Sequence, residues 1–435
     1  MRLDQALDSM WMMLAAVLVM LMQVGFVLLE VGSTRAKNAG HIAVKQVIGF
    51  SVAALAFWVA GYAVAFGEGK WIGTTGWFLH LPQDSGALPI SVSYLFQFAF
   101  LAVSLAIAWG GFAERGKLGI YIVFGAIYSI FIYPVVGHWV WGEHGWLHLL
   151  GKQDFAGSTV VHLQGGVAAL VATMMLKPRL GKFDKRGMSV EIPGHNQVYT
   201  VLGVFVIWFG WFGFNPGSAT HVQDGLFAYA ALTTNLAAAA GALTMYFISR
   251  ITTGKADISA TLNGALSALV AITAPCAFVR PWAAVVIGAV AGTVGYYSGK
   301  WFERKGIDDP VSAASVHGAA GVWGTLSCGI FAAPDLVKNV GIGRAGLFYG
   351  GGWEQLAVQA LGIVVTMAFV AAASFAALWV LEKVIGLRVS EHEERNGLDL
   401  SEHGRYGYIS LPFPVNRVEA PDRRETVWES GQKVL

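Results

Sequence analysis

Charged residues are scarce in this 435-residue sequence and make up 13% of the chain. Soluble proteins usually carry roughly 25%, whereas hydrophobic residues here reach 55%. A chain of this composition cannot present enough polar surface to water, so the excess apolar surface must face lipid. The composition therefore excludes a set of ordinary soluble domains and indicates an integral membrane protein.

Other features are also scarce. The two cysteines, Cys276 and Cys328, form no C-x-x-C pair and no disulfide framework. A net charge of +2 without basic runs among aromatic residues gives no indication of nucleic-acid binding. No cleavage-site pattern follows the first apolar stretch, so we expect a retained span rather than a secretory signal. The sequence indicates neither an enzyme nor a cofactor.

Long apolar stretches are abundant, and each is long enough for a helix that crosses a hydrocarbon core of roughly 30 Å. They lie near residues 10–31, 45–66, 90–112, 118–139, 156–176, 197–216, 224–248, 258–278, 281–299, 312–332 and 354–384. The sequence therefore predicts an all-α membrane protein of eleven transmembrane helices. We expect a transmembrane domain over 1–386 and a polar tail over 387–435.

The positions of the Lys and Arg residues provide a check on the predicted spans. All of them are expected in loops, at helix ends or in the tail. If the loops alternate sides, one side receives 15 Lys and Arg residues and the other receives 6. By the positive-inside rule, the N-terminus is expected outside and the C-terminal tail in the cytoplasm.

An internal repeat relates the fifth and tenth stretches. Asp154 and His162 share the pattern D-x7-H-x3-G-V with Asp309 and His317. A second match, G-x4-[EN]-x-G-S, relates the first and sixth stretches. Because five spans are an odd number, two five-helix halves must have opposite orientations. The prediction is a five-plus-five inverted repeat with its functional centre near the midplane, plus one extra helix.

The two histidines, His162 and His317, lie well inside apolar stretches, where an ionisable group is expensive and by default functional. The repeat places them at equivalent positions, so a facing pair is expected. Such a pair can contact a small polar solute or pass a proton. A structural role, in which each imidazole binds a neighbouring helix, is the alternative. Two ligands without a third make a poor metal site, and we expect no metal.

Other candidate residues each have an ordinary explanation as well. Asp154 precedes the fifth span, where it is either a helix cap or a group that orients a cation, and the two roles are compatible. Phe96 and Phe100 share a helix face, which usually reflects packing. Trp141 fits an aromatic belt at the membrane interface. Ser218 follows the GFNPGS helix break, where it could bind a solute.

Six strings resemble the ammonium transporter family (Amt/Mep/Rh) over essentially all of the predicted spans. They are DFAGSTVVHLQGGVAALV, WFGFNPGSA, FQFAFLAVSLAIAWGGFAER, LMQVGFVLLEVGSTRAKN, SVHGAAGVWGTL and GLDLSEHG. The resemblance implies an eleven-helix fold, usually a homotrimer with one pore per subunit. Trp141 with Ser218 resembles the microbial Amt branch more than the Rh glycoproteins, which implies a bacterial inner (plasma) membrane.

The resemblance also implies a role for each candidate. Phe100, Trp141 and Ser218 would bind NH4+ on the outer side, and Phe96 and Phe214 would gate the pore below. Asp154 would support cation binding and deprotonation. His162 and His317 would line the pore and relay a proton. The net species (NH4+, NH3, or NH3 with H+) stays open.

The tail departs from the family pattern. The family usually has an acidic residue after the HG of GLDLSEHG, whereas Arg405 stands here. In the family this tail takes part in activity control and docks PII-type signal proteins, so Arg405 puts that partner in doubt. The main rival function is an ammonium sensor that binds NH4+ without significant transport. A gas channel of the Rh kind is a second rival, and Trp141 with Ser218 counts against it.

Overall fold

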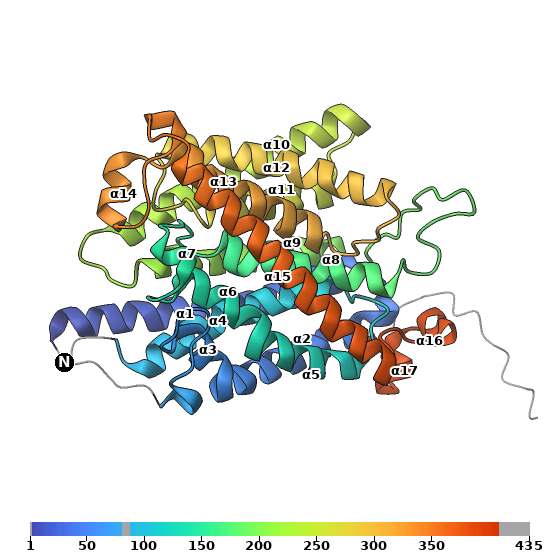
Figure 1. Ribbon diagram of the computed structural model, residues 1–435. Coiled ribbons are helices and arrows are strands. Elements are labelled where there is room, and N and C mark those ends of the chain that lie inside the picture. Colours follow the sequence, from blue (N-terminus) through green and yellow to red (C-terminus); the bar gives the residue numbers. More distant parts are fainter. Residues whose placement is uncertain (1, 81–87, 409–435) are drawn as a thin grey trace, which may run out of the picture.

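The computed structural model of the protein describes residues 2–80 and 88–408 and consists of helices joined by turns and loops (Figure 1). The α-helices are α1 (Leu3–Ser33), α2 (Ala39–Ala56), α3 (Tyr62–Phe66), α4 (Ile90–Gly110), α5 (Leu118–Ile127), α6 (Tyr133–Trp141), α7 (Trp146–Leu149), α8 (Gln164–Leu176), α9 (Gln197–Phe214), α10 (Leu226–Thr253), α11 (Ile258–Ile272), α12 (Pro281–Arg304), α13 (Ala320–Phe331), α14 (Pro334–Val340), α15 (Glu354–Val384), α16 (Glu391–Asn396) and α17 (Leu398–His403). Short 3-10 helices are η1 (Ala36–Asn38), η3 (Trp77–Leu79), η6 (Pro216–Ala219) and η8 (Leu347–Tyr349), and π-helices are η2 (Phe57–Gly61), η4 (Tyr128–Ile132), η5 (Ser158–Leu163) and η7 (Ala314–Ala319). Within these two ranges no residue lies in a β-strand, which confirms the predicted all-α class.

Nine helical segments in the described part of the chain are long and apolar enough to cross a membrane. They are Leu3–Ser33, Ala36–Phe66, Ile90–Gly110, Leu118–Leu149, Ser158–Leu176, Gln197–Ala219, Leu226–Thr253, Pro281–Arg304 and Glu354–Val384. A tenth is counted if Ala314–Phe331 and Pro334–Val340, bent by 110° at their junction, form one span. The remaining predicted stretch contains α11, which has 15 residues. Nine or ten of the eleven predicted spans therefore pass on length and hydropathy among the described residues, and the count of eleven stays a prediction.

The shortness of α11 has a local cause. The helix ends at Ile272, three residues before Pro275. A proline ring disfavours helical geometry in the residue before it and removes a backbone donor. The chain continues as turns through the rest of the predicted stretch, near 273–278, and these residues are buried.

The long helices run side by side, and four short helices, α7, α14, α16 and α17, lie at the two ends of the bundle (Figure 1). α7, α14 and the start of α1 lie at one end, while α16 and α17 lie at the other, and α15 crosses the bundle obliquely. Large apolar side chains are exposed along the helix flanks, among them Phe209, Phe247, Ile251, Val364 and Phe375. An exposed apolar flank of this kind is stable against lipid rather than water.

The two segments that share the D-x7-H pattern have the same local structure. The Asp154 carboxylate accepts from the backbone N–H groups five and six residues further on, at 3.0 and 3.1 Å. The Asp309 carboxylate does the same at 2.9 and 3.2 Å. In both segments the capped helix begins as a π-helix, η5 or η7, that carries the histidine. π-helices are rare and often mark functional sites. The local pattern therefore repeats in space, while the inversion of the two halves stays a prediction.

Lys45 departs from the expectation that basic residues lie in loops, at helix ends or in the tail. α2 begins at Ala39, so Lys45 lies in its second turn and is fully buried. Its Nζ lies 2.5 Å from the carboxylate of Glu30 on α1. The apolar stretch is predicted to start near residue 45, whereas α2 begins at Ala39. Gly40 and His41 in its first turn interrupt the apolar pattern, so the sequence does not show where the helix begins. A buried lysine is tolerated here because its charge is paired with a carboxylate.

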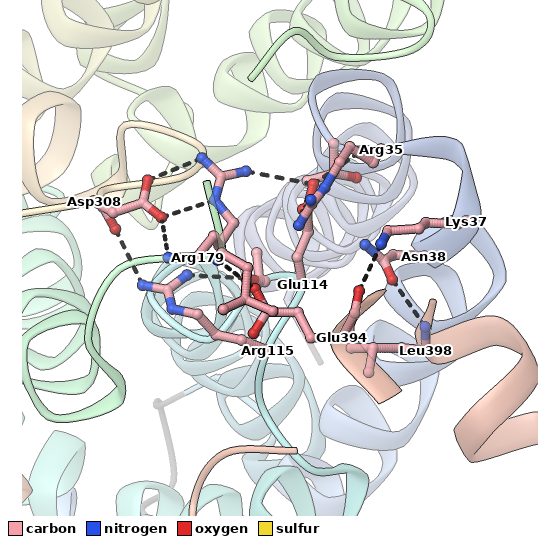
Figure 2. Close-up of polar contacts among 12 residues, drawn as sticks. Arg35, Lys37, Asn38, Glu114, Arg115, Arg179, Asp308, Glu394 and Leu398 are labelled. Carbon is pink, nitrogen blue, oxygen red and sulfur yellow. Dashed lines mark hydrogen bonds and ion pairs between the residues drawn. The ribbon is translucent and has the colours of Figure 1, made fainter. Parts of the chain in front are cut away.

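Buried charges join four connections at the end of the bundle that carries α16 and α17 (Figure 2). Arg179 donates to both carboxylate oxygens of Asp308 at 2.8 and 2.9 Å and lies 3.4 Å from Glu114. Arg35 pairs with Glu114 from the other side. Arg115 donates to the Asp308 backbone carbonyl at 3.1 Å. We call these five residues the ion cluster. It ties together connections that are far apart in the sequence.

The first part of the predicted tail packs against these connections. Glu394 accepts from the Leu180 backbone N–H at 2.8 Å and pairs with Arg388 at 2.6 Å. Asp399 accepts from two backbone N–H groups in the first turn of α2 at 2.7 and 3.0 Å, where the helix dipole favours a negative charge. Residues 387–408 are therefore ordered against the membrane helices. The rest of the predicted tail, 409–435, lies outside the described residues.

Candidate functional site

A cavity of about 380 Å³ opens at the end of the bundle that carries α14. The residues that line it include Phe96, Phe100, Trp141, Lys152, Asp154 and Ser218. We call it the aromatic cavity. It brings together all three side chains expected to bind the cation, and also the aspartate expected to support them.

Backbone contacts hold the polar edge of the aromatic cavity. The Trp141 indole, at the last residue of α6, donates to the backbone carbonyl of Asp154 at 2.8 Å. α9 ends at Phe214, and Pro216 begins the short turn η6 that carries Ser218. The Ser218 hydroxyl donates to the Phe214 carbonyl at 3.0 Å. Its lone pairs remain available to a hydrogen-bond donor in the cavity.

Aromatic rings close the floor of the cavity. The rings of Phe100 and Phe214 stack with centroids 4.0 Å apart, and the Phe100 ring lies 5.9 Å from that of Trp141. Phe96 packs on Phe100 at 4.6 Å and lines the cavity near Ser218. The family resemblance implies Phe100 at the cation site and Phe96 with Phe214 at the gate. In the structure Phe96 and Phe100 both line the cavity, and Phe214 stacks on Phe100, one helical turn further along α4 than Phe96. The division of roles between the two rings stays a prediction.

The two histidines meet beyond the stacked phenylalanines. The His162 and His317 Nδ1 atoms lie 3.2 Å apart, and their rings are nearly parallel with centroids 5.3 Å apart. The His162 ring also stacks on Trp211 at 5.1 Å and lies 5.5 Å from Phe214. An Nδ1–Nδ1 contact requires one ring to donate and the other to accept. The predicted facing pair is therefore present.

His162 also has an open polar atom. Its Nε2 is buried and has no hydrogen-bond partner among the described residues. Buried polar atoms are nearly always paired, and an unpaired one needs an explanation. A small polar solute passing the imidazole would be such a partner. No three His, Cys, Asp or Glu side chains in the described ranges are placed to hold a metal ion.

Asp154 is a helix cap whose carboxylate is completely buried. Besides its two bonds to the start of η5, it accepts from the Gly157 N–H at 3.1 Å. Backbone donors therefore hold both carboxylate oxygens beside the aromatic cavity. Burial raises the pKa of its counterpart Asp309 to about 6, against the lowering effect of the Ser315 and Ala314 N–H groups.

Gly166 allows the two histidine-bearing segments to approach. A Cβ at this position would lie 2.3 Å from the backbone nitrogen of Gly318 and 3.0 Å from the carbonyl carbon of His317. These are backbone atoms, so the segments would have to separate. We expect Gly166→Ala to lower the free energy of unfolding by roughly 1–3 kcal/mol, the usual cost of overpacking. The measurement is the melting temperature of the detergent-solubilised protein.

Gly318→Ala is the matched control. Its Cβ would come no closer than 3.8 Å to the Gly166 backbone, which is an ordinary contact. This variant is expected to melt close to the wild type. Equal melting temperatures for the two variants would show that close approach at Gly166 is not required.

The sequence patterns give no indication of a site role for Lys152, Thr159 or Thr325. A lysine in a predicted loop is expected to be exposed, yet the Lys152 side chain is fully buried. Its Nζ donates to the Thr159 hydroxyl at 2.8 Å, and Thr159 bonds Thr325 at 2.7 Å. The available signal was its position two residues before Asp154, where a basic side chain can lie close to the capping carboxylate.

Known proteins resemble this chain over nearly its whole length. The model of the Ammonium Transporter Family matches residues 10–408. Ammonium transporter Amt2 of Archaeoglobus fulgidus is 44% identical over 429 residues, covering 95% of this chain and 90% of that protein. Among solved structures, a sensor Amt protein has a TM-score of 0.86 at 35% identity and covers 92% of this chain and 99% of its own. Candida albicans Mep2 has a TM-score of 0.83 at 30% identity, with coverages of 92% and 90%.

Proposed function

The chain belongs to the ammonium transporter family, whose members are multi-pass membrane proteins, and we propose that it moves ammonium by separating NH4+ into NH3 and a proton inside the membrane. NH4+ binds in the aromatic cavity, loses a proton near the stacked phenylalanines, and passes as NH3 along the imidazoles. The observation that carries this proposal is the contact between His162 and His317 directly beyond a cavity of aromatic rings.

Cation binding rests on three side chains that line the aromatic cavity, Phe100, Trp141 and Ser218. Aromatic faces attract a cation by about 0.5–2 kcal/mol per ring, depending on desolvation. The Ser218 oxygen accepts a hydrogen bond from NH4+, which K+ of similar size cannot donate. Asp154 adds a buried negative charge behind the site. Phe96, which packs on Phe100, belongs with Phe214 to the gate in this proposal.

Deprotonation follows from the barrier below the cavity. The stacked rings of Phe100 and Phe214 fill the path, and a bare ion in such apolar surroundings is strongly penalised. Neutral NH3 avoids this penalty, and the paired imidazoles supply hydrogen-bonding groups along the way. The Nδ1–Nδ1 contact also provides a route for the proton. Net transport is then electrogenic.

The membrane topology is part of the proposal. It comprises eleven spans in two inverted five-helix halves with an added last helix, an outer N-terminus and a cytoplasmic tail after residue 386. The excess of basic residues on one side supports this orientation. The working form is a homotrimer in the bacterial inner membrane. A PII-type protein is a candidate partner at the tail, where Arg405 replaces an acidic residue.

The test is a current measurement on a solid-supported membrane with the reconstituted full chain. Ammonium pulses are expected to give a saturable current that K+ pulses of equal concentration do not reproduce. A binding isotherm for ammonium without any current would overturn transport and favour a sensor. That alternative is worth testing because one of the similar structures is a sensor Amt protein.

A further inference from the structure

A buried lysine lies behind the aromatic cavity. The Lys152 side chain is fully buried, although its residue is part of the cavity lining. Its Nζ lies 3.9 Å from the Asp154 carboxylate and 2.8 Å from the Thr159 hydroxyl. Taking an ammonium group out of water costs several kcal/mol unless it is paired. The only carboxylate within ion-pairing distance of it, among the described residues, is the one expected to assist the cation site.

The surrounding helices make room for this lysine. Its side-chain carbons pack where a Cβ of Gly362 on α15 would be, with Cε only 2.3 Å from that position. The Thr159 hydroxyl is in turn hydrogen-bonded to the hydroxyl of Thr325 on α13 at 2.7 Å. The Nζ position is therefore fixed by three elements rather than by a flexible loop. A charge held in one place acts on the cavity with constant strength.

The repeat shows that the aspartate cap does not need a lysine. The offset that relates Asp154 to Asp309 and His162 to His317 places Ile307 at the position of Lys152. Asp309 caps its helix through the same two backbone positions without a basic side chain at that place. Lys152 is therefore an addition to the cap, found only in the half that bears the aromatic cavity.

We propose that the Lys152 ammonium group acts as an internal cation that partly neutralises Asp154 and so sets the concentration at which ammonium fills the aromatic cavity. The inference rests on the proposed function and identifies a positioning residue, because Lys152 acts on the site through Asp154. An ammonium group of the chain and the ammonium ion of the substrate then compete for the same negative charge. Removing the internal cation strengthens the attraction for the external one.

The effect depends on pH in a defined direction. Burial lowers the pKa of Lys152, against the raising effects of Asp154 and Cys328. Lys152 therefore loses its charge at a lower pH than an ordinary lysine. Asp154 and Cys328 act directly on its charge, and the cavity lining also carries the titratable residues His148, His221 and Asp224. As pH rises, the affinity of the wild type should approach that of a variant without the lysine.

The experiment compares Lys152→Met and Lys152→Gln with the wild type in the solid-supported membrane assay. Both variants remove the charge, while only glutamine can still bond Thr159. We expect the half-saturating ammonium concentration to fall roughly tenfold in both, equivalent to one pKa unit of interaction. Removing one partner of a buried ion pair costs stability, but the Asp154 carboxylate keeps its three bonds from backbone N–H groups in both variants. The melting temperature of each variant is therefore measured beside its current.

Lys338→Met is the matched control, because it removes an exposed lysine from α14 at the same end of the bundle. Its half-saturating concentration should stay at the wild-type value. An unchanged value in Lys152→Met, or opposite shifts in Met and Gln, would overturn the proposal and leave Lys152 as a packing residue. Calorimetric titration with methylammonium measures the affinity of the aromatic cavity for a cation and does not require transport. A tenfold tightening there would support the role of Lys152 even if wild-type protein carried no current, so the two proposals fail separately.

Discussion

Replacing both His162 and His317 by leucine is expected to abolish the ammonium current while the protein still folds. The imidazoles supply the polar groups in a path otherwise closed by apolar side chains. Losing two hydrogen-bonding groups at about 1.5 kcal/mol each raises the barrier by about 3 kcal/mol, or at least roughly a hundredfold in rate. The measurement is the peak current after an ammonium pulse, normalised to the amount of reconstituted protein.

The double variant folds because the two polar atoms that meet are removed together. The Nδ1 atoms contact each other at 3.2 Å. Replacing both partners of a buried hydrogen bond by apolar groups is often nearly neutral, whereas replacing one leaves the other unsatisfied. His162→Leu alone is therefore expected to melt below the double variant. An ammonium current of wild-type size in the double variant would rule out the imidazole path.

The sequence predicted those parts of the site whose chemistry is local. Asp154 and Asp309 precede helices at a fixed spacing, so their role as caps follows from the chain itself. The histidines follow from the same repeat. Their meeting could be expected because the segments are equivalent, and the structure places their Nδ1 atoms in contact.

The places of Phe96 and Phe100 could not be settled in this way. Both lie on one face of α4, one turn apart, so either could reach the gate. In the structure Phe100 stacks on Phe214, which lies on α9, more than a hundred residues away, so no pattern along α4 could show this contact. The spacing of residues along one helix shows which face of the helix they share, but not how far along the pore each side chain lies.

Buried ion pairs were the largest omission. Lys45 and Glu30 lie on different helices, and Arg179 and Asp308 are separated by 129 positions in the chain. Counting basic residues assigns each one to a side of the membrane and carries no information about its partner. The count therefore predicts a charge asymmetry between the two sides of the membrane but cannot show which charges are buried.

Removing the Asp308 side chain is expected to be the most destabilising change in the ion cluster. Asp308→Ala leaves the buried guanidinium of Arg179 without its two-oxygen partner. Breaking a buried pair from one side typically costs roughly 3–5 kcal/mol, because the remaining charge is uncompensated. The melting temperature of the detergent-solubilised protein measures the loss. Asp335→Ala is the control, because its pair with Arg280 is exposed and should change stability by less than about 1 kcal/mol.

The same carboxylate predicts how stability depends on pH. Burial alone would raise the pKa of Asp308, but hydrogen bonds and charge from Arg179 hold it at about 2. Because this is below the pKa of about 3.9 in an unfolded chain, the contribution is present above pH 4 and is lost as pH falls toward 2. The wild type should therefore lose roughly 2 kcal/mol of its advantage over Asp308→Asn in that window. A stability difference that stays constant down to pH 2 would show that the Arg179 pair does not depend on the charge of Asp308.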